Sequence, residues 1–160
     1  MNALPERVHD LLREGGSTLA TAESLTGGRL AALLTAVPGA SATYRGGVVA
    51  YASDVKTSVL GVPQDLVDRV GVVSAECAAA MAEGVRRLIG ATYGVATTGV
   101  AGPAEQEGKA PGTVFVAVAG PGGGPTLALE LPGGRDQVVD RTCEEALSAL
   151  LSLLASTGLR

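Results

Sequence analysis

The sequence predicts a three-layer α/β/α domain built around a mixed, mostly parallel sheet. In the first part of the chain, short β-rich runs alternate with helical patterns, which is typical of parallel strands joined by crossover helices. Later, two β-rich runs are separated only by the Gly- and Pro-rich segment 120–125, and this spacing predicts an antiparallel hairpin. A chain of 160 residues can bury a single core, so we interpret residues 1–160 as one domain.

The N-terminal part of the chain carries the alternating pattern. Apolar residues at helical spacing predict helices, and β-rich runs bounded by turn residues predict strands. Ser74 precedes an alanine-rich segment and suits the N-cap of a helix. The predicted elements are a helix over 5–13, a strand over 17–22, a helix from the Ser24 turn to Val37, a strand over 44–52, and helices over 53–60, 63–70 and 75–89.

The C-terminal part contains the predicted hairpin and the last helix. Val114, Val116 and Val118 recur at every second position, which places them on one face of a strand. Residues 104–112 are polar and contain Pro and Gly, so they predict a mobile loop. The predicted elements are strands over 93–98, 113–119 and 126–131, and a final helix over 136–155.

The composition argues against several classes of function. Only 2% of the residues are aromatic, so few rings are available for stacking on nucleic-acid bases, and the net charge of −4 is opposite to that of a general nucleic-acid binder. No apolar run approaches the ~20 residues of a membrane span, and the chain does not begin with a signal-peptide pattern. We therefore expect no nucleic-acid partner, no membrane partner and a cytoplasmic location.

The cysteines and the histidine narrow the chemistry further. Cys77 and Cys143 fall inside predicted helices without metal-ligand spacing, so we expect buried thiols, no metal and no cofactor. His9 is the only histidine, and we expect it on the solvated face of the first helix. A Ser-His-Asp triad, a two-histidine zinc site or a Cys-His pair is therefore not expected.

The stretch Thr21–Gly28 places a hydroxyl residue where a strand ends and a helix begins. Ser24 is followed by Gly27 and Gly28, which lack Cβ atoms and let a ligand lie against the backbone. Unpaired N–H groups at a helix start favour an anion or a developing oxyanion. Ser24 and Thr26 are also good N-cap residues, and on pattern alone a structural cap is the commoner explanation.

Two further junctions and one lysine complete the candidate set. Thr97–Gly102 follows the third predicted strand and Gly133–Arg135 leads into the last helix, and ligands of open α/β sheets bind where such loops converge. Lys56, just after the second strand, is either a solvated surface residue or a base. A serine nucleophile needs a proton acceptor, and lysine serves if burial lowers its pKa from about 10.4. No full Walker or dinucleotide spacing is present.

Five motifs occur in order along nearly the whole chain, roughly residues 4–154. They are Thr21–Ser24 with Thr26–Gly28, Gly46–Tyr51 running into Lys56, Gly71–Ser74, Thr98–Pro103, and Gly112–Val114. In these motifs the chain closely resembles the CinA C-terminal domain family, the nicotinamide-nucleotide amidohydrolases. The chain departs from the family pattern after Gly102-Pro103, where it carries Ala104-Glu105-Gln106 in place of the usual Asp and Gly.

The resemblance implies an activity and a role for individual residues. The activity is the hydrolysis of nicotinamide mononucleotide to nicotinate mononucleotide and ammonia by a serine and a lysine, without a metal, in a three-layer α/β/α domain that is commonly a homodimer. The implied catalytic residues are Ser24, Lys56 and Tyr51. The implied substrate-binding residues are Thr26, Gly27, Gly28, Ser41, Thr98, Gly99, Gly102 and Arg135.

Under this interpretation neutral Lys56 takes the proton of Ser24, and Tyr51 relays it. N–H groups near Thr26–Gly28 hold the oxyanion, while Thr98–Gly102 and Arg135 hold the ribose phosphate. Two other functions stay open. A nucleotide-binding or assembly module of the competence or damage-inducible type would use the same loops while Lys56 stays protonated, and a related enzyme would hydrolyse another amide or nucleotide. The expected partners are a small-molecule nucleotide and a second copy of the chain.

Overall fold

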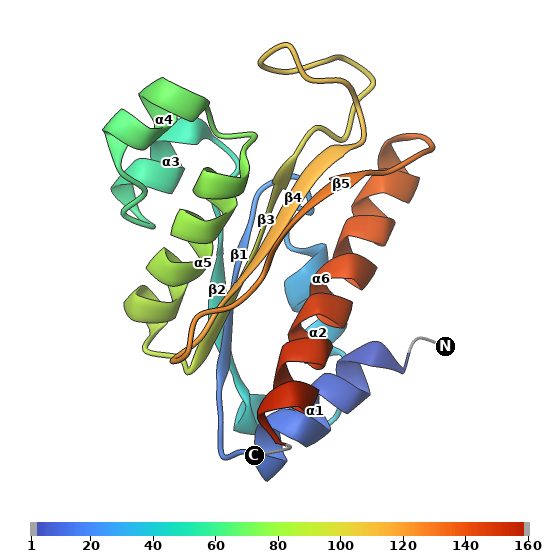
Figure 1. Ribbon diagram of the computed structural model, residues 1–160. Coiled ribbons are helices and arrows are strands. Elements are labelled where there is room, and N and C mark those ends of the chain that lie inside the picture. The colour runs from blue at the N-terminus through green and yellow to red at the C-terminus, as the bar shows by residue number, and fades with distance from the viewer. Residues whose placement is uncertain (1–2, 159–160) are drawn as a thin grey trace.

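The computed structural model describes residues 3–158 and contains a five-stranded sheet with helices on both faces (Figure 1). The strands are β1 (Leu19–Glu23), β2 (Tyr44–Val49), β3 (Tyr93–Gly99), β4 (Thr113–Ala119) and β5 (Thr126–Glu130), in the spatial order β2-β1-β3-β4-β5. β1 is parallel to β2 and β3, and β4 is antiparallel to both β3 and β5. Only β4 therefore runs against the other strands, which confirms the predicted mixed, mostly parallel sheet.

The helices form the two outer layers of the domain. They are α1 (Leu4–Glu14), α2 (Arg29–Thr35), α3 (Ser53–Ser58), α4 (Gln64–Val70), α5 (Ala75–Ile89) and α6 (Arg135–Thr157), with a short 3-10 helix η1 (Ala40–Ala42). Figure 1 shows α1, α2 and α6 on one face of the sheet, and α3, α4 and α5 on the other. No helix within residues 3–158 combines the length and the apolar character needed to cross a bilayer.

Each layer buries its own apolar cluster against the sheet. One cluster joins α1, α2 and α6 to the sheet through residues such as Leu12, Leu30 and Leu150. The other joins α5 and its neighbours through small and medium side chains such as Ala78 and Met81. All five residues of β1 are buried, because this central strand is covered on both faces. Ser24, which follows β1, is therefore attached to a strand that is buried along its whole length.

Helix α5 packs closely against the sheet. Gly94 in β3 faces α5, and a Cβ added there would lie 2.1 Å from the carbonyl oxygen of Ala82, so only glycine allows this approach. The buried alanines of α5 serve the same end, since they present little side-chain volume to the strands. The low aromatic content of the sequence is therefore consistent with close packing, because few large rings have to fit between the layers.

The prediction for His9 is wrong, because the side chain is fully buried and not solvated. Its Nε2 donates to the carbonyl oxygen of Leu34 at 2.8 Å, and its Nδ1 lies 2.6 Å from the hydroxyl of Thr43. The ring thus joins α1 to the end of α2 and to the start of β2. Both ring nitrogens have partners, which makes burial of this polar group tolerable. The expected buried cysteines, Cys77 and Cys143, are confirmed as free and buried.

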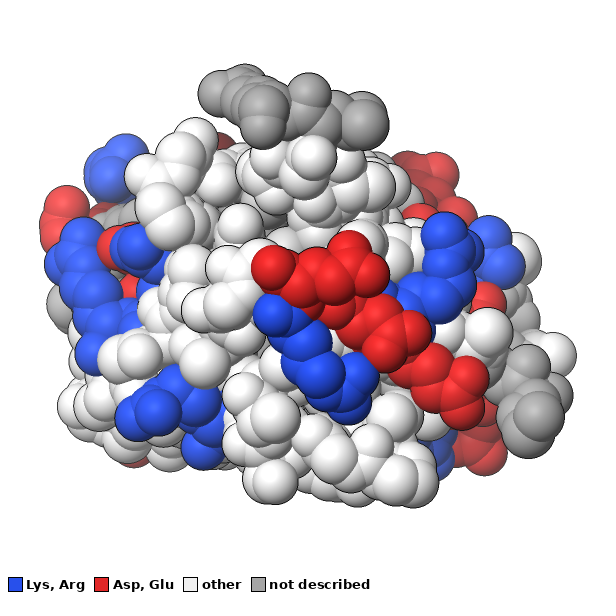
Figure 2. Space-filling view, turned by 90° about the horizontal axis from the view of Figure 1, so that it is seen from below, with Lys and Arg blue, Asp and Glu red and all other residues white. Residues whose placement is uncertain are grey.

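Charges on the described surface are mixed in sign. Figure 2 shows acidic and basic side chains next to one another on the face seen from below. Most exposed ion pairs lie within one helix, such as Arg13 with Asp10 at 2.8 Å in α1, while Arg29 joins α2 to Asp136 and Asp140 of α6 at 3.2 Å. Pairs of this kind contribute only about 0–1 kcal/mol each to stability.

Candidate active site

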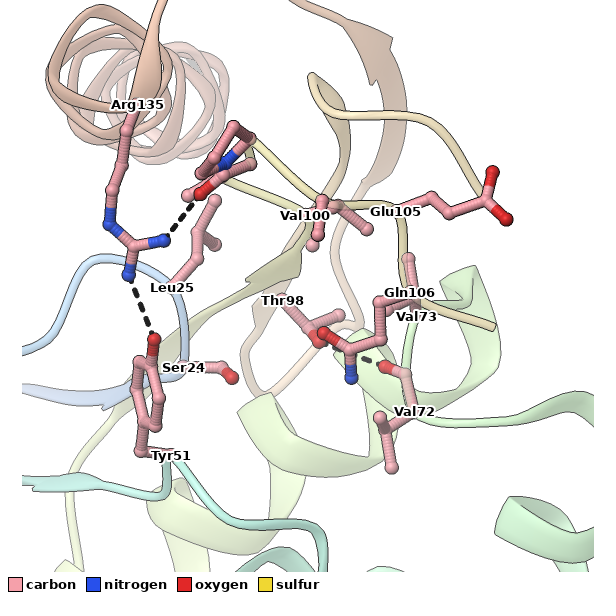
Figure 3. A pocket seen from close by; sticks show the side chains of 15 residues that line it. Ser24, Leu25, Tyr51, Val72, Val73, Thr98, Val100, Glu105, Gln106 and Arg135 are labelled. Atoms are coloured by element: carbon pink, nitrogen blue, oxygen red, sulfur yellow. Dashed lines mark hydrogen bonds between the residues drawn. The ribbon is translucent and has the colours of Figure 1, made fainter. Parts of the chain in front are cut away.

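A cavity of about 310 Å³ opens at the ends of the parallel strands, and several segments distant in sequence converge on it (Figure 3). It is lined by Ser24-Leu25 after β1, Tyr51 after β2, Val72-Val73 before α5, residues 98–106 at and after the end of β3, and Arg135 at the start of α6. This volume lies at the lower end of the range for small-molecule sites. The cavity thus has the location that open α/β sheets give to a ligand.

Ser24 lies in a tight turn between β1 and α2, and not at a helix start. Its N–H donates to the carbonyl oxygen of Thr97 at 3.0 Å, and its own carbonyl oxygen accepts from the N–H of Gly27 at 3.1 Å. Gly27 and Gly28 have φ values of +56° and +101°, which L side chains adopt only with strain. α2 begins at Arg29 with Gly28 as its N-cap, so the alternative in which Ser24 or Thr26 caps this helix is wrong.

Glu23, which the sequence analysis did not single out, provides the capping contacts of α2. Its carboxylate is 1% exposed and accepts from the N–H groups of Leu30 at 2.8 Å and Ala31 at 3.1 Å. It also accepts from the hydroxyl of Thr26 at 2.7 Å, so the turn itself is tied to the same group. The signal in the sequence is a carboxylate at the end of an otherwise apolar buried strand, where it must find donors. Glu23 therefore fixes the turn that carries Ser24.

We expect Glu23→Gln to destabilise the fold. The introduced amide NH₂ would face a backbone N–H, so at least one buried donor would lose its acceptor, at a cost of about 1–3 kcal/mol. Urea unfolding followed by circular dichroism measures the change. Glu130→Gln, on the exposed side of edge strand β5, is the matched control and should leave stability unchanged. Equal stability of the Glu23 variant and the wild type would show that this carboxylate does not cap α2.

Lys56 is the largest of the fully buried side chains and points at Ser24. It comes from α3, and its Nζ lies 3.0 Å from the Oγ of Ser24, 2.7 Å from the carbonyl oxygen of Ala50 and 3.2 Å from that of Tyr51. An ammonium group would donate to all three oxygens. A neutral amine would donate to the two carbonyl oxygens and accept the proton of the serine hydroxyl. The alternative of a solvated surface lysine is excluded by its 1% exposure.

Burial lowers the pKa of Lys56 from its usual value near 10.5, because loss of water disfavours the charged form. Negative charge on Glu107, and on Cys77 when it is ionised, would raise the pKa of Lys56, but more weakly. Burial in turn raises the pKa of Cys77 to about 11, so that this neighbouring group stays a neutral thiol at pH 7. The site therefore favours the form of Lys56 that can accept a proton.

Two backbone N–H groups that follow Ser24 are unpaired. Leu25 and Thr26 lie between β1 and α2, and within residues 3–158 their N–H groups have no hydrogen-bond partner. The N–H of Gly27 is already used by the carbonyl oxygen of Ser24. The sequence does not distinguish among the N–H groups near Thr26–Gly28. Of the two unpaired groups, that of Leu25 belongs to a residue that lines the cavity, and that of Thr26 lies one residue further along the same turn. Unpaired N–H donors next to a nucleophile are the usual arrangement for holding an oxyanion.

Arg135 and Tyr51 line the side of the cavity that faces away from Val72 and Val73 (Figure 3). The Arg135 guanidinium donates to the carbonyl oxygen of Gly102 at 2.6 Å and to the Tyr51 hydroxyl at 2.9 Å. Within residues 3–158 the other three of its five N–H donors have no hydrogen-bond partner, so they can bind an anion. The Tyr51 hydroxyl contacts Arg135, and it is the Tyr51 carbonyl oxygen that contacts Lys56.

The other predicted substrate-binding residues divide into three groups. Thr98, Gly99 and Gly102 line the cavity, although the Thr98 hydroxyl already donates to the carbonyl oxygen of Val72 at 2.8 Å. Thr26, Gly27 and Gly28 shape the turn without lining the cavity. Ser41 lies on η1, before β2, whose first residue pairs with the first residue of β1. The described chain therefore places Ser41 at the other end of the sheet from Ser24.

No group of three or more His, Cys, Asp or Glu side chains in the described range is arranged to hold a metal ion. The polar side chains that point into the cavity instead carry hydroxyl, amide and guanidinium groups, and backbone groups line the cavity beside them. These groups can bind an anion, and Ser24 and Lys56 can exchange a proton. That combination is the one required for attack by a serine on a carbonyl carbon.

Comparison with known proteins gives one consistent result. Residues 1–154 match the family described as the CinA C-terminal domain. A CinA-like protein of Frankia casuarinae is 52% identical over 145 residues, which are 91% of this chain and 34% of that protein. A putative competence-damage inducible protein of Geobacillus sp. is 47% identical over 147 residues, or 91% of this chain and 35% of that protein. The chain thus spans about a third of the length of these relatives.

Solved structures agree with the sequence matches. The crystal structure of a competence-damaged protein (CinA) superfamily protein from Klebsiella pneumoniae superposes with a TM-score of 0.93 at 36% identity, over 98% of this chain and 99% of that one. The crystal structure of a CinA superfamily protein from Escherichia coli superposes with a TM-score of 0.91 at 33% identity, over 94% of this chain and 88% of that one. The fold and the positions of the elements around the cavity are therefore shared with these proteins.

Proposed function

The chain belongs to the CinA C-terminal domain family, and from this premise we propose that it is an amidohydrolase acting on nicotinamide mononucleotide. The proposed reaction converts the nucleotide and water to nicotinate mononucleotide and ammonia. The observation that carries the proposal is the buried Lys56 Nζ, 3.0 Å from the Oγ of Ser24 at a cavity. A lysine whose pKa is lowered by burial, next to a serine hydroxyl, is a general base for an acyl transfer.

The first half of the reaction forms an acyl-enzyme. Neutral Lys56 accepts the hydroxyl proton as the Ser24 Oγ bonds to the carboxamide carbon. The carbonyl oxygen becomes an oxyanion, and it accepts hydrogen bonds from the N–H groups of Leu25 and Thr26. The C–N bond then breaks, and the Lys56 ammonium returns its proton to the departing nitrogen. Ammonia leaves, and the acyl group stays as an ester of Ser24.

The second half releases the acid. Lys56, neutral again, accepts a proton from a water molecule as the water oxygen bonds to the ester carbon. The tetrahedral intermediate collapses with loss of the Ser24 oxygen, which recovers the proton from Lys56. Nicotinate mononucleotide leaves as a carboxylate after losing its acid proton to solvent. Because the Tyr51 hydroxyl accepts a hydrogen bond from Arg135, we propose that Tyr51 orients that arginine. Within the described range its hydroxyl is not hydrogen-bonded to Ser24 or Lys56, the contact that the predicted proton relay would need.

The direct test incubates purified protein with nicotinamide mononucleotide and measures ammonia and nicotinate mononucleotide together. Stoichiometric release of both supports the proposal. Binding of the nucleotide without turnover would instead favour the binding or assembly module, in line with the competence-damage names of several relatives. Turnover confined to a different amide would keep the mechanism and replace the substrate.

We further expect Arg135→Ala to weaken turnover of the mononucleotide by roughly 10–100-fold, because a charge-assisted contact to phosphate is lost. Nicotinamide riboside, which lacks the phosphate, should lose far less. Arg141→Ala, on the exposed side of the same helix, is the control and should change neither substrate. The measurement is kcat/KM for both substrates, and equal losses on the two would leave Arg135 with a structural role only.

A further inference from the structure

The loop between β3 and β4 ends in a tight hairpin whose tip is fixed to the rest of the domain. In Figure 1 this loop extends beyond the ends of the strands. At its tip the N–H of Gln106 donates to the carbonyl oxygen of Lys109 at 3.1 Å, and the N–H of Lys109 donates back to Gln106 at 2.8 Å. Glu107 and Gly108 have φ values of +54° and +72°, as in the two-residue turns of β-hairpins. The segment expected to be a mobile loop therefore has a defined turn.

A set of contacts, here called the clasp, holds this tip against the segment before α5. The Glu107 carboxylate accepts from the N–H groups of Val72 at 3.0 Å and Val73 at 2.8 Å. The Lys109 ammonium donates to the carbonyl oxygen of Val73. Gly71 makes room for the clasp, since a Cβ there would lie 2.6 Å from the Glu107 carboxylate. A positive φ at Glu107 costs energy, and the two hydrogen bonds to its carboxylate offset that cost.

The clasp places the Gln106 side chain in the cavity. Figure 3 shows this amide pointing into the cavity near Thr98, whereas the neighbouring Glu105 side chain points away from it. Within residues 3–158 the Gln106 amide has no hydrogen-bond partner. A side-chain amide offers one acceptor and one donor group side by side. Gln106 therefore presents unused, paired hydrogen-bonding capacity to a ligand.

The position of Gln106 relative to Ser24 and Arg135 indicates which part of the substrate it meets. In Figure 3 Arg135 and Gln106 lie on opposite sides of Ser24. If Arg135 holds the phosphate and Ser24 attacks the carboxamide carbon, the substrate extends from Arg135 towards Ser24 and its carboxamide end faces the far side. That side carries Gln106.

We propose that Gln106 is a specificity-determining residue that hydrogen-bonds the substrate carboxamide and is positioned by the clasp, an inference that rests on the proposed function. Its Oε1 accepts from the carboxamide NH₂ while its Nε2 donates to the carboxamide oxygen. The product carboxylate has no N–H, so it can keep only one of the two bonds. Gln106 thus favours the amide over the acid. It pairs with both the NH₂ and the oxygen of the carboxamide, whereas against the product carboxylate its own Oε1 stays unpaired.

The test measures the affinities of nicotinamide mononucleotide and nicotinate mononucleotide by titration calorimetry in the Ser24→Ala background, where the amide is not consumed. Gln106→Ala should lower the affinity for the amide about tenfold, the value of one to two hydrogen bonds, and should change the affinity for the acid much less. Gln106→Glu keeps an acceptor for the NH₂ and repels the carboxylate, so it should keep or raise the preference for the amide. Equal losses for both ligands, or no loss for either, would overturn the proposal.

The role of the clasp is tested by a double-mutant cycle. Glu107→Ala should reduce the preference for the amide as Gln106→Ala does, and should reduce it no further when the two are combined. Glu105→Ala is the matched control, because it removes a neighbouring carboxylate that points away from the cavity. Additive effects of the two variants would show that Glu107 does not act through Gln106. Absence of ammonia release by the wild-type protein would count against the proposed function alone, since the affinity ratio is measured without turnover.

Discussion

Replacing Ser24 by alanine should reduce ammonia release from nicotinamide mononucleotide to the background rate, a loss of at least about 10⁴-fold, because no other group takes the place of the nucleophile. The fold should survive. Among residues 3–158 the Ser24 hydroxyl has one hydrogen-bond partner, Lys56, which keeps the carbonyl oxygens of Ala50 and Tyr51 as partners. The measurement is ammonia release by the purified variant, alongside its urea unfolding curve.

The matched control for this experiment is Ser58→Ala, at the exposed end of α3, which should keep wild-type turnover and stability. A Ser24→Ala protein that folds and still turns over at more than a small residual rate would remove Ser24 from the role of nucleophile. A water molecule activated directly by Lys56 would then be the remaining route to the acid.

Lys56→Arg should lose activity as completely as Lys56→Ala, by about 10²–10⁴-fold, the usual effect of removing a general base. A guanidinium group stays protonated at any workable pH, so it can hold an anion but cannot accept the Ser24 proton. Turnover and equilibrium binding of the nucleotide should be measured for both variants, with unfolding curves, since the larger arginine enters a fully buried position. Near-normal turnover by a folded arginine variant would show that Lys56 supplies charge only, and the serine–lysine mechanism would have to be abandoned.

The pH–rate profile of the wild type provides a second readout of the same group. Because burial lowers the pKa of Lys56, the neutral form is reached below the usual value near 10.5. The rate should therefore rise with pH as Lys56 loses its proton, and level off before pH 10.5. This rise should be absent from the residual activity of Lys56→Ala.

The order and type of the elements were predictable because apolar periodicity reports which face each element buries. The direction of single polar side chains was not. His9 stands beside Asp10 and resembles a surface residue, yet its partners Leu34 and Thr43 lie 25 and 34 positions away. The start of α2 was placed too early for a related reason. Ser24 and Thr26 are good capping residues and so predicted an early start. The helix instead begins at Arg29 and is capped by the side chain of Glu23, the last residue of β1.

The site was predictable to the extent that the motifs resembled a known family. Nothing local in the sequence joins Ser24 to Lys56, which is 32 residues away, and the structure brings them to 3.0 Å because the strand ends of β1 and β2 lie side by side. The clasp was not predictable at all. A polar segment with Gly and Pro is typical of a mobile loop. The contact that fixes it depends on Gly71, which is distant in the sequence and leaves room for the Glu107 carboxylate.

The strand order also separates the residues proposed for catalysis from those proposed for substrate recognition. From β1 the chain crosses to β2 through α2 on one face of the sheet, and from β2 it crosses back over β1 to β3 through α5 on the other. The connections diverge at the end of β1, and Ser24 lies at this topological switch point. Ser24 and Lys56 are thus set in the buried crossovers, whereas Gln106 and Arg135 belong to the hairpin side of the domain. Exchange of the segment 103–111 should therefore alter which amide is accepted while the serine–lysine pair remains intact.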